Sequence, residues 1–172
     1  AWDPAYEGLS TSADENIRDR ADQVAVLLGD RRVFPRIRRL LSDTTASIEK
    51  REQAIQILVR GNDTEAAPYL HQALAEPALR AAAIRALANY DHASTPTELL
   101  RRYGSLNQDE RRDAVGTLTS RPECANALLN AVAAEQVARY DLHAYNVRQI
   151  MSFSNPTLQD KLRDVWGQIR EA

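Results

Sequence analysis

The chain has a single cysteine, few aromatic residues and six isolated glycines among its 172 residues. One cysteine, Cys124, excludes an internal disulfide and a thiolate metal cluster, and the sequence contains no Cys-x-x-Cys-His haem motif. Isolated glycines provide no Gly-rich turn for a dinucleotide. The three histidines are dispersed without metal-ligand spacing: His71, His92 and His143. We therefore predict no catalytic, cofactor-binding or metal-binding residue, and we predict that this chain is not an enzyme.

Long apolar runs and an excess of positive charge are also missing. No stretch approaches the roughly 18 apolar residues of a membrane span, and no signal peptide is recognisable. The net charge is -2, which argues against bulk binding of nucleic acid. The residues alone do not fix the compartment. What is abundant is Ala, Leu and Arg, a composition typical of an all-helical protein.

One helical phrase recurs along the chain. In residues 79–90, Ala83, Ile84 and Leu87 fall on one helical stripe. Related phrases occur around Ala54 and Ala114, so the three copies are 29 and 31 residues apart. A period near 30 indicates a repeat array, in which each unit needs its neighbours to bury its apolar face.

The positions of capping residues, of apolar stripes and of the Gly and Pro residues that end helices predict ten helices and no strand. Residues 1–13 lack helical periodicity and are interpreted as an N-terminal arm, pinned through Trp2 and Tyr6. Asp141 is expected to cap the ninth helix. The predicted ranges are about 14–28, 34–41, 48–60, 66–74, 79–90, 95–103, 108–119, 122–134, 145–151 and 156–171. In the first helix the residues expected to face inward are Ile17, Ala21, Val24, Leu27 and Leu28.

The pairing of a Leu-rich helix, a tight turn and an Arg-x-x-Ala-(Ile/Val)-x-x-Leu helix resembles HEAT repeats. The resemblance covers about residues 30–152. It implies an all-α fold, an α-solenoid of about five HEAT-like helix pairs. We expect one solenoid domain over residues 14–172, preceded by the arm over residues 1–13.

The last third of the chain carries a narrower likeness. Its segments 118–122, 127–132, 140–142, 148–150 and 165–167 are together similar to the helical region of large secreted planctomycete proteins. Those proteins join a dehydrogenase-like β-propeller, a HEAT-like region and a C-terminal c-type cytochrome. The resemblance implies a periplasmic or exported parent protein with haem c in an adjacent domain. The sequence departs from this family at residues 135–136, where a Gly-containing turn is expected.

A basic segment places five arginines in nine residues: Arg31, Arg32, Arg36, Arg38 and Arg39. Guanidinium groups bind phosphate bidentately, so the segment is a candidate interaction surface and supports a nucleic-acid-binding alternative. The competing and favoured interpretation is a solvated helix face balanced by nearby carboxylates: Asp19, Asp22, Asp30 and Asp43.

Three further arginines occupy matched repeat positions, three residues before each repeat alanine: Arg51, Arg80 and Arg111. They could line a ligand groove. The repeated position favours a structural ladder, in which each arginine binds acidic or carbonyl groups of the adjacent turn. Together these features predict a non-catalytic scaffold or spacer and protein-interaction module whose partners are proteins or neighbouring domains of the same polypeptide.

Overall fold

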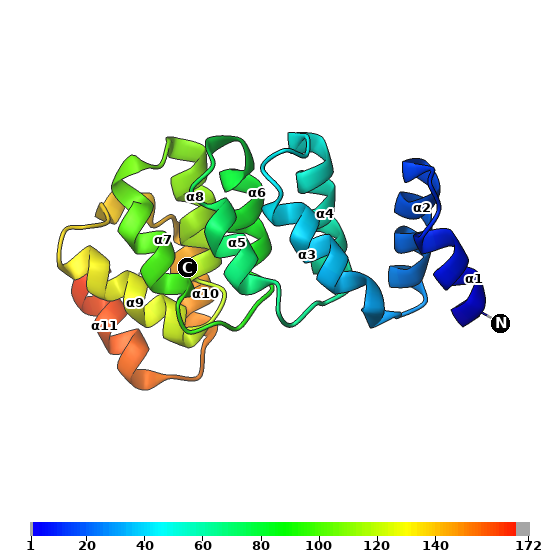
Figure 1. The fold of residues 1–172 in the computed structure, drawn as a ribbon. Coiled ribbons are helices and arrows are strands. Elements are labelled where there is room, and N and C mark those ends of the chain that lie inside the picture. Colours follow the sequence, from blue (N-terminus) through cyan, green and yellow to red (C-terminus); the bar gives the residue numbers. More distant parts are fainter. Residues whose placement is uncertain (1, 168–172) are drawn as a thin grey trace. The chain divides into compact units, whose positions relative to one another are not determined.

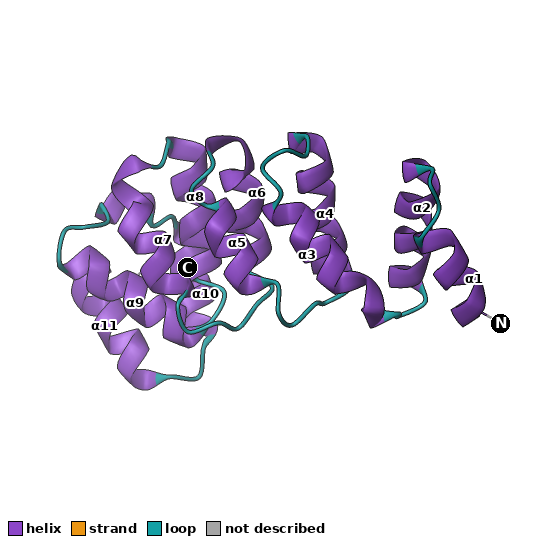
Figure 2. Ribbon diagram, viewed as in Figure 1, coloured by secondary structure: helices purple, strands orange, loops and turns teal. Residues whose placement is uncertain are grey.

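The computed structural model describes residues 2–167 of the chain. Within this range the chain forms eleven α-helices, three short 3-10 helices and no strand (Figures 1 and 2). The all-helical prediction is therefore confirmed. The helices form two compact units, one ending at Ala73 and the other beginning at Leu74, and each unit is described by itself.

The first unit contains five α-helices and one 3-10 helix. Polar side chains cap two of its helices, because Asp14 accepts a hydrogen bond from the backbone of Asn16 and Ser47 accepts one from Lys50. The elements in order are α1 (Trp2–Ser10), α2 (Glu15–Leu27), η1 (Arg31–Val33), α3 (Phe34–Ser42), α4 (Ile48–Arg60) and α5 (Ala67–Ala73).

Helix α3 packs against α4 and α5 through buried apolar residues, among them Phe34, Ile37 and Leu58. The turn after α4 approaches this core closely. A Cβ atom on Gly61 would lie 2.6 Å from the Phe34 ring, so only glycine fits there without displacing a buried aromatic. Asn62 follows with φ of 50°, in the left-handed region that ends many helices.

Residues 2–10 form a regular helix, which their weak helical periodicity did not predict. Helix α1 packs on α2 and is held by the two aromatic residues that the sequence singled out. The indole nitrogen of Trp2 donates to Asp30 at 3.1 Å, and the hydroxyl of Tyr6 donates to Asp22 at 3.1 Å. Tertiary contacts thus stabilise a segment whose own periodicity is weak.

The inward face predicted for α2 is mostly wrong. Ala21 is buried as expected, together with Asp22 and Ala25. The four larger apolar residues of the prediction are exposed instead: Ile17, Val24, Leu27 and Leu28. The helix is therefore rotated so that its small residues meet α1 and α4, and its large apolar residues face outward.

The second unit contains six α-helices and two 3-10 helices. Helix α6 packs on α8, and α9 packs on α7, α8 and α11. The capping box that begins α8 joins Asn107 and Glu110. The elements in order are α6 (Pro77–Leu87), α7 (Thr95–Arg102), η2 (Tyr103–Ser105), α8 (Gln108–Leu118), α9 (Pro122–Ala133), η3 (Arg139–Asp141), α10 (Ala144–Ser152) and α11 (Pro156–Trp166).

Inside this unit the repeat stripe is buried as predicted, because Ala83, Ile84 and Leu87 are fully enclosed. Thr117 on α8 donates to the backbone carbonyl of Ile84 at 2.8 Å and so joins two helices through a buried polar bond.

Two predictions concern the end of the second unit: the cap of α10 and the end of the last helix. Asp141 was expected to cap α10, but it lies in η3 and accepts a hydrogen bond from Tyr103 at 2.9 Å. His143 is the residue that begins α10. The predicted end of the last helix and of the solenoid domain, residues 168–172, lies outside the described residues.

Candidate interaction surface

The basic segment lies in the first unit, on η1 and α3, where Arg39 belongs to the last turn of α3. Asp30 begins η1 by accepting a hydrogen bond from the backbone of Arg32, and Pro35 occupies the first turn of α3, where its missing N–H costs little. Successive residues point in different directions on this tight helical path. Three of the five arginines, Arg32, Arg36 and Arg38, bind different carboxylates.

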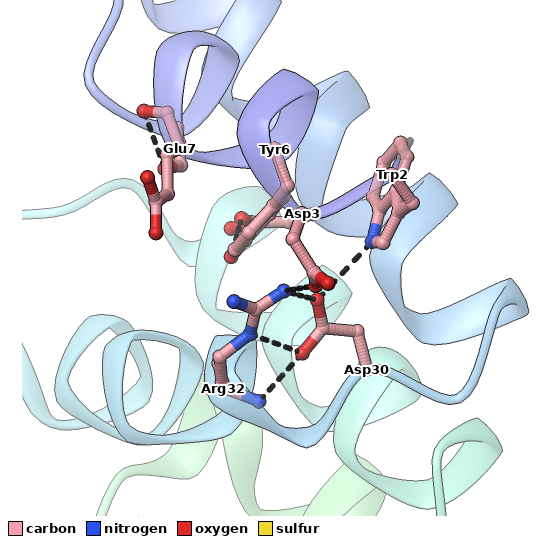
Figure 3. A network of polar contacts seen from close by, with 8 residues as sticks. Trp2, Asp3, Tyr6, Glu7, Asp30 and Arg32 are labelled. Carbon is pink, nitrogen blue, oxygen red and sulfur yellow. Dashed lines mark hydrogen bonds and ion pairs between the residues drawn. The ribbon is translucent and has the colours of Figure 1, made fainter.

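Arg32 belongs to a polar network that ties α1 to η1 (Figure 3). Its guanidinium binds Asp30 through two hydrogen bonds of 2.9 and 2.7 Å and binds Asp3 at 2.6 Å. It also lies over the ring of Tyr6 at 5.6 Å. The hydrogen bonds from Arg32 hold the pKa of Asp30 well below its usual range. The charge of Arg32 is thus offset by two carboxylates from α1 and η1.

Arg36 is bound to Asp22, which is only 1% exposed. The same carboxylate accepts the hydrogen bond from Tyr6, so it connects α1, α2 and α3. Burial raises the pKa of Asp22, although the charge of Arg36 opposes the shift. Since one partner is deeply buried, removing either charge would leave the other unpaired at a helix contact.

Arg38 is the buried member of the segment. Its Nε atom lies 3.3 Å from a carboxylate oxygen of Asp63, and it also forms an ion pair with Glu65. The guanidinium lies 5.8 Å from the centre of the Tyr69 ring. Arg38 therefore stabilises the packing of α3 near α5 and is not available to an external anion.

Three arginines of the segment are exposed, Arg31, Arg32 and Arg39, and of these Arg32 is bound to the carboxylates described above. Arg39 lines a shallow depression of about 250 Å³ between α2, α3 and α4. The charged lining is mixed in sign, with four carboxylates and four cations: Glu15, Asp19, Asp22 and Asp43, and Arg18, Arg36, Arg39 and Lys50. A phosphate backbone laid along this surface would meet carboxylates as often as cations. This geometry favours the balanced-surface interpretation over a nucleic-acid interface.

The three matched arginines each donate to a backbone carbonyl upstream in the chain, Arg51 and Arg80 from Nε and Arg111 from a terminal nitrogen. Arg51 donates from Nε to the carbonyl of Leu41 at 2.8 Å, and Arg80 donates from Nε to the carbonyl of Leu74 at 2.8 Å. Arg111 donates to the carbonyl of Gly104 at 3.3 Å and lies over the Tyr103 ring at 5.6 Å. In the sequence, each acceptor lies at or just beyond the end of the preceding α-helix, where carbonyls lack intrahelical partners. This is the bonding that a structural ladder requires, and the role itself stays a prediction.

The histidines and the cysteine are not gathered into a site. In the part of the chain that the structure describes, no three His, Cys, Asp or Glu side chains are placed to hold a metal ion. Cys124 is buried in the first turn of α9, and burial raises the pKa of its thiol, which disfavours the reactive thiolate.

Sequence reasoning missed two features of this surface. The partners Asp3, Asp63 and Glu65 escaped notice because they lie 25 to 29 residues from the arginines they bind. The exposed apolar residues of α2 were assigned to the core. The spacing of apolar residues by three and four positions correctly indicates a stripe on one side of a helix, but it does not show whether another element covers that stripe.

The comparison with known families supports the repeat assignment. The family model of HEAT repeats matches residues 43–119, from the end of α3 to just beyond α8. No curated protein and no solved structure matches the chain. The region is a HEAT-like helical repeat, and the fold class is an all-α α-solenoid.

HEAT repeats are commonly protein-interaction scaffolds, so the match bears on function at that level. Across the described residues, the structure contains no helix with both the length and the apolar character needed to cross a membrane.

Proposed function

We propose that this chain is a non-catalytic scaffold or spacer that holds other protein domains. The observation that carries the proposal is the HEAT-repeat match, combined with the state of the charged side chains. Arg32, Arg36 and Arg38 bind carboxylates of their own unit, and Arg51 and Arg80 bind backbone carbonyls. These charged side chains therefore hold helices in place within each unit, which suits a scaffold.

The proposed setting is a larger exported protein that contains a dehydrogenase-like β-propeller and a c-type cytochrome. The sequence resemblance in the last third of the chain supports this setting. In it, haem c would be bound by an adjacent domain and no cofactor by this chain, and the location would be periplasmic or extracellular. The contribution of the chain would be geometric, namely the spacing and orientation of the electron-transferring modules.

The test of the setting begins with the coding sequence around the chain. A propeller upstream and a Cys-x-x-Cys-His motif downstream are expected. The purified chain is expected to be colourless, to take up no haem stoichiometrically and to show no dye-linked dehydrogenase activity with sugars or alcohols. Flanking regions without either module would refute the setting, and haem uptake or turnover that depends on any one histidine would refute the non-catalytic assignment.

The test of the scaffold function uses the protein isolated from its source. Zero-length cross-linking of carboxylates to amines, followed by mass spectrometry, is expected to join exposed residues of this chain to another domain or protein. The two lysines, Lys50 and Lys161, lie on different units and report on both. Cross-links confined to the chain itself would contradict the proposal.

The alternative, nucleic-acid binding through the basic segment, rests on the exposure of Arg31 and Arg39. A titration with duplex DNA at physiological salt separates the two functions. We expect at most the weak, salt-sensitive binding of non-specific contacts, in the range of about 1–100 μM. A sub-micromolar affinity that falls in Arg36→Ala and Arg39→Ala variants would favour the alternative.

A further inference from the structure

The outward face of α2 carries an apolar stripe that no other element of the first unit covers. We call Ile17, Val24, Leu27 and Leu28 the α2 stripe. Leu27 is 73% exposed and Leu28 is 60% exposed, and Ile17 and Val24 are also classed as exposed. Residues 17, 24 and 28 are separated by seven and four positions, so they align along one side of the helix. An aligned set of large exposed apolar residues marks an interaction surface.

Helix α11 of the second unit provides a contrast with α2. Its apolar residues Leu158 and Leu162 are buried, and its exposed positions are charged, as at Asp160, Arg163 and Asp164. The outer face of α11 is therefore polar. Helix α2 has the opposite arrangement, with small residues inward and large apolar residues outward.

The charges on α2 are divided between its two sides. Glu15 binds Lys50, Asp22 binds Arg36, and Asp19 lines the depression that contains both of these cations. These carboxylates therefore face α3 and α4. Arg20 lies on the other side, three residues from Ile17 and four from Val24, and so within the α2 stripe. It is exposed and has no ion pair with any described residue.

From this division we infer that the α2 stripe docks an amphipathic helix of another protein or domain, one whose apolar face carries a carboxylate opposite Arg20. The inference rests on the proposed scaffold function and names the chemistry of its partner. Apolar contacts would cover Val24, Leu27 and Leu28, and the partner's carboxylate would bind the guanidinium bidentately in the resulting dry surface.

Two other occupants fit the surface less well. A second copy of the chain, packed α2 on α2, would place each Arg20 against a stripe that offers no carboxylate. A membrane surface would find one cation on the stripe, whereas stable electrostatic attachment to anionic lipids depends on several basic residues. The segregated single cation fits a partner that supplies a single anion.

The experiment uses the full chain and three labelled helical peptides with the same leucine stripe. The peptides differ only at one position inside the stripe, which is Glu, Gln or Lys, and binding is followed by fluorescence anisotropy. The Glu peptide is expected to bind about fivefold more tightly than the Lys peptide. Arg20→Glu is expected to reverse this order. Val24→Asp is expected to weaken binding of every peptide by about tenfold or more, since it places a charge where apolar area would be buried.

The control is Tyr145→Asp, which introduces the same charge at an exposed position of the second unit and should change nothing. Far-ultraviolet circular dichroism verifies that each variant is folded. The inference is overturned if no peptide saturates, or if Arg20→Glu leaves the Glu and Lys peptides in the same order. It is also overturned if sedimentation shows self-association that Val24→Asp abolishes, or if the chain binds phosphatidylcholine–phosphatidylglycerol vesicles through the stripe.

Failure of this inference is distinguishable from failure of the scaffold function. Cross-linking to other domains without binding of the peptides would refute the docking surface but not the scaffold function. A chain that does neither would refute both.

Discussion

Arg51 provides the sharpest test of the ladder. Its side chain is almost fully buried, and its Nε donates at 2.8 Å to the carbonyl of Leu41, near the carboxyl end of α3. Arg51→Met keeps most of the aliphatic volume but removes the donor and its charge. A charge-assisted hydrogen bond contributes about 1.5–3 kcal/mol, and a buried carbonyl left without a donor adds a further cost. We therefore expect the free energy of unfolding of the first unit to fall by about 2–4 kcal/mol.

The assay can isolate the first unit. Trp2 lies in that unit and Trp166 in the other, so a Trp166→Phe background leaves Trp2 as the fluorescent reporter. Arg51→Met should lower the guanidinium chloride concentration at the midpoint of unfolding without changing the slope of the unfolding transition. Arg39→Met, at an exposed position, is the matched control and should alter stability by less than about 0.5 kcal/mol.

The outcome also separates the ladder from a ligand groove. If Arg51→Met costs no more than Arg39→Met, the buried bond contributes nothing and the structural interpretation is wrong. If stability is retained but cross-linking to another domain is lost, Arg51 belongs to a binding groove instead.

Three further perturbations test the packing. Leu87→Ala should lower the stability of the second unit by about 2–5 kcal/mol, because Leu87 is fully buried; a loss under about 0.5 kcal/mol in chemical denaturation would contradict its place in the core. Gly61→Ala should cost about 1–3 kcal/mol, since its Cβ would lie 2.6 Å from the buried Phe34 ring, and Gly104→Ala, where no atom lies within 4 Å, is the control in the same thermal scan. Burial and the charge of Asp22 raise the pKa of Tyr6 from 10 to about 12. The protonated Tyr6 hydroxyl therefore contributes fully to the stability of the folded state below pH 10, and this contribution is lost as the pH rises from 10 to 12. Tyr6→Phe should remove this part of the pH dependence of Trp2-monitored unfolding, and an unchanged profile would exclude Tyr6 as its source.

The helices that the sequence predicts well are those with both a cap and a covered stripe. Ser47 and the stripe through Ala54, Ile55 and Leu58 place α4 at residues 48–60, as observed. Local chemistry is sufficient there because it agrees with the tertiary packing. Helix α6 has no side-chain cap and runs over Pro77–Leu87, not over the predicted 79–90, but its stripe is buried as predicted and it packs on α8.

The failures have a common cause in long-range contacts. Helix α1 contains Pro4 and Gly8 and buries only Tyr6, so its partners Asp22, Asp30 and Arg32 decide its structure. No local pattern contains that information. The apolar stripe of α2 was visible, but its burial depends on whether a neighbour exists, which periodicity does not encode.

The candidate sites divide in the same way. The matched positions of Arg51, Arg80 and Arg111 were evident from the sequence repeat. Their carbonyl acceptors could be identified only in the folded structure. The basic segment was equally evident, but its neutralisation by Asp63 and Glu65 was not, since both follow in a later helix connection.

The arginine–carbonyl bonds have a consequence for how such a chain can change its length. Arg51, Arg80 and Arg111 each find their acceptor no more than ten residues upstream, well inside one repeat period. A duplication or deletion of one whole period therefore carries each of these donors together with its acceptor. Two ion pairs do span two copies, Arg85 with Asp113 and Arg80 with Glu110. Arg85 is exposed and the loss of its pair would cost little, whereas Glu110 is buried and would lose its cation. A rearrangement that adds or removes one whole repeat would therefore preserve the arginine–carbonyl bonds, and its energetic cost would fall on the ion pairs between copies.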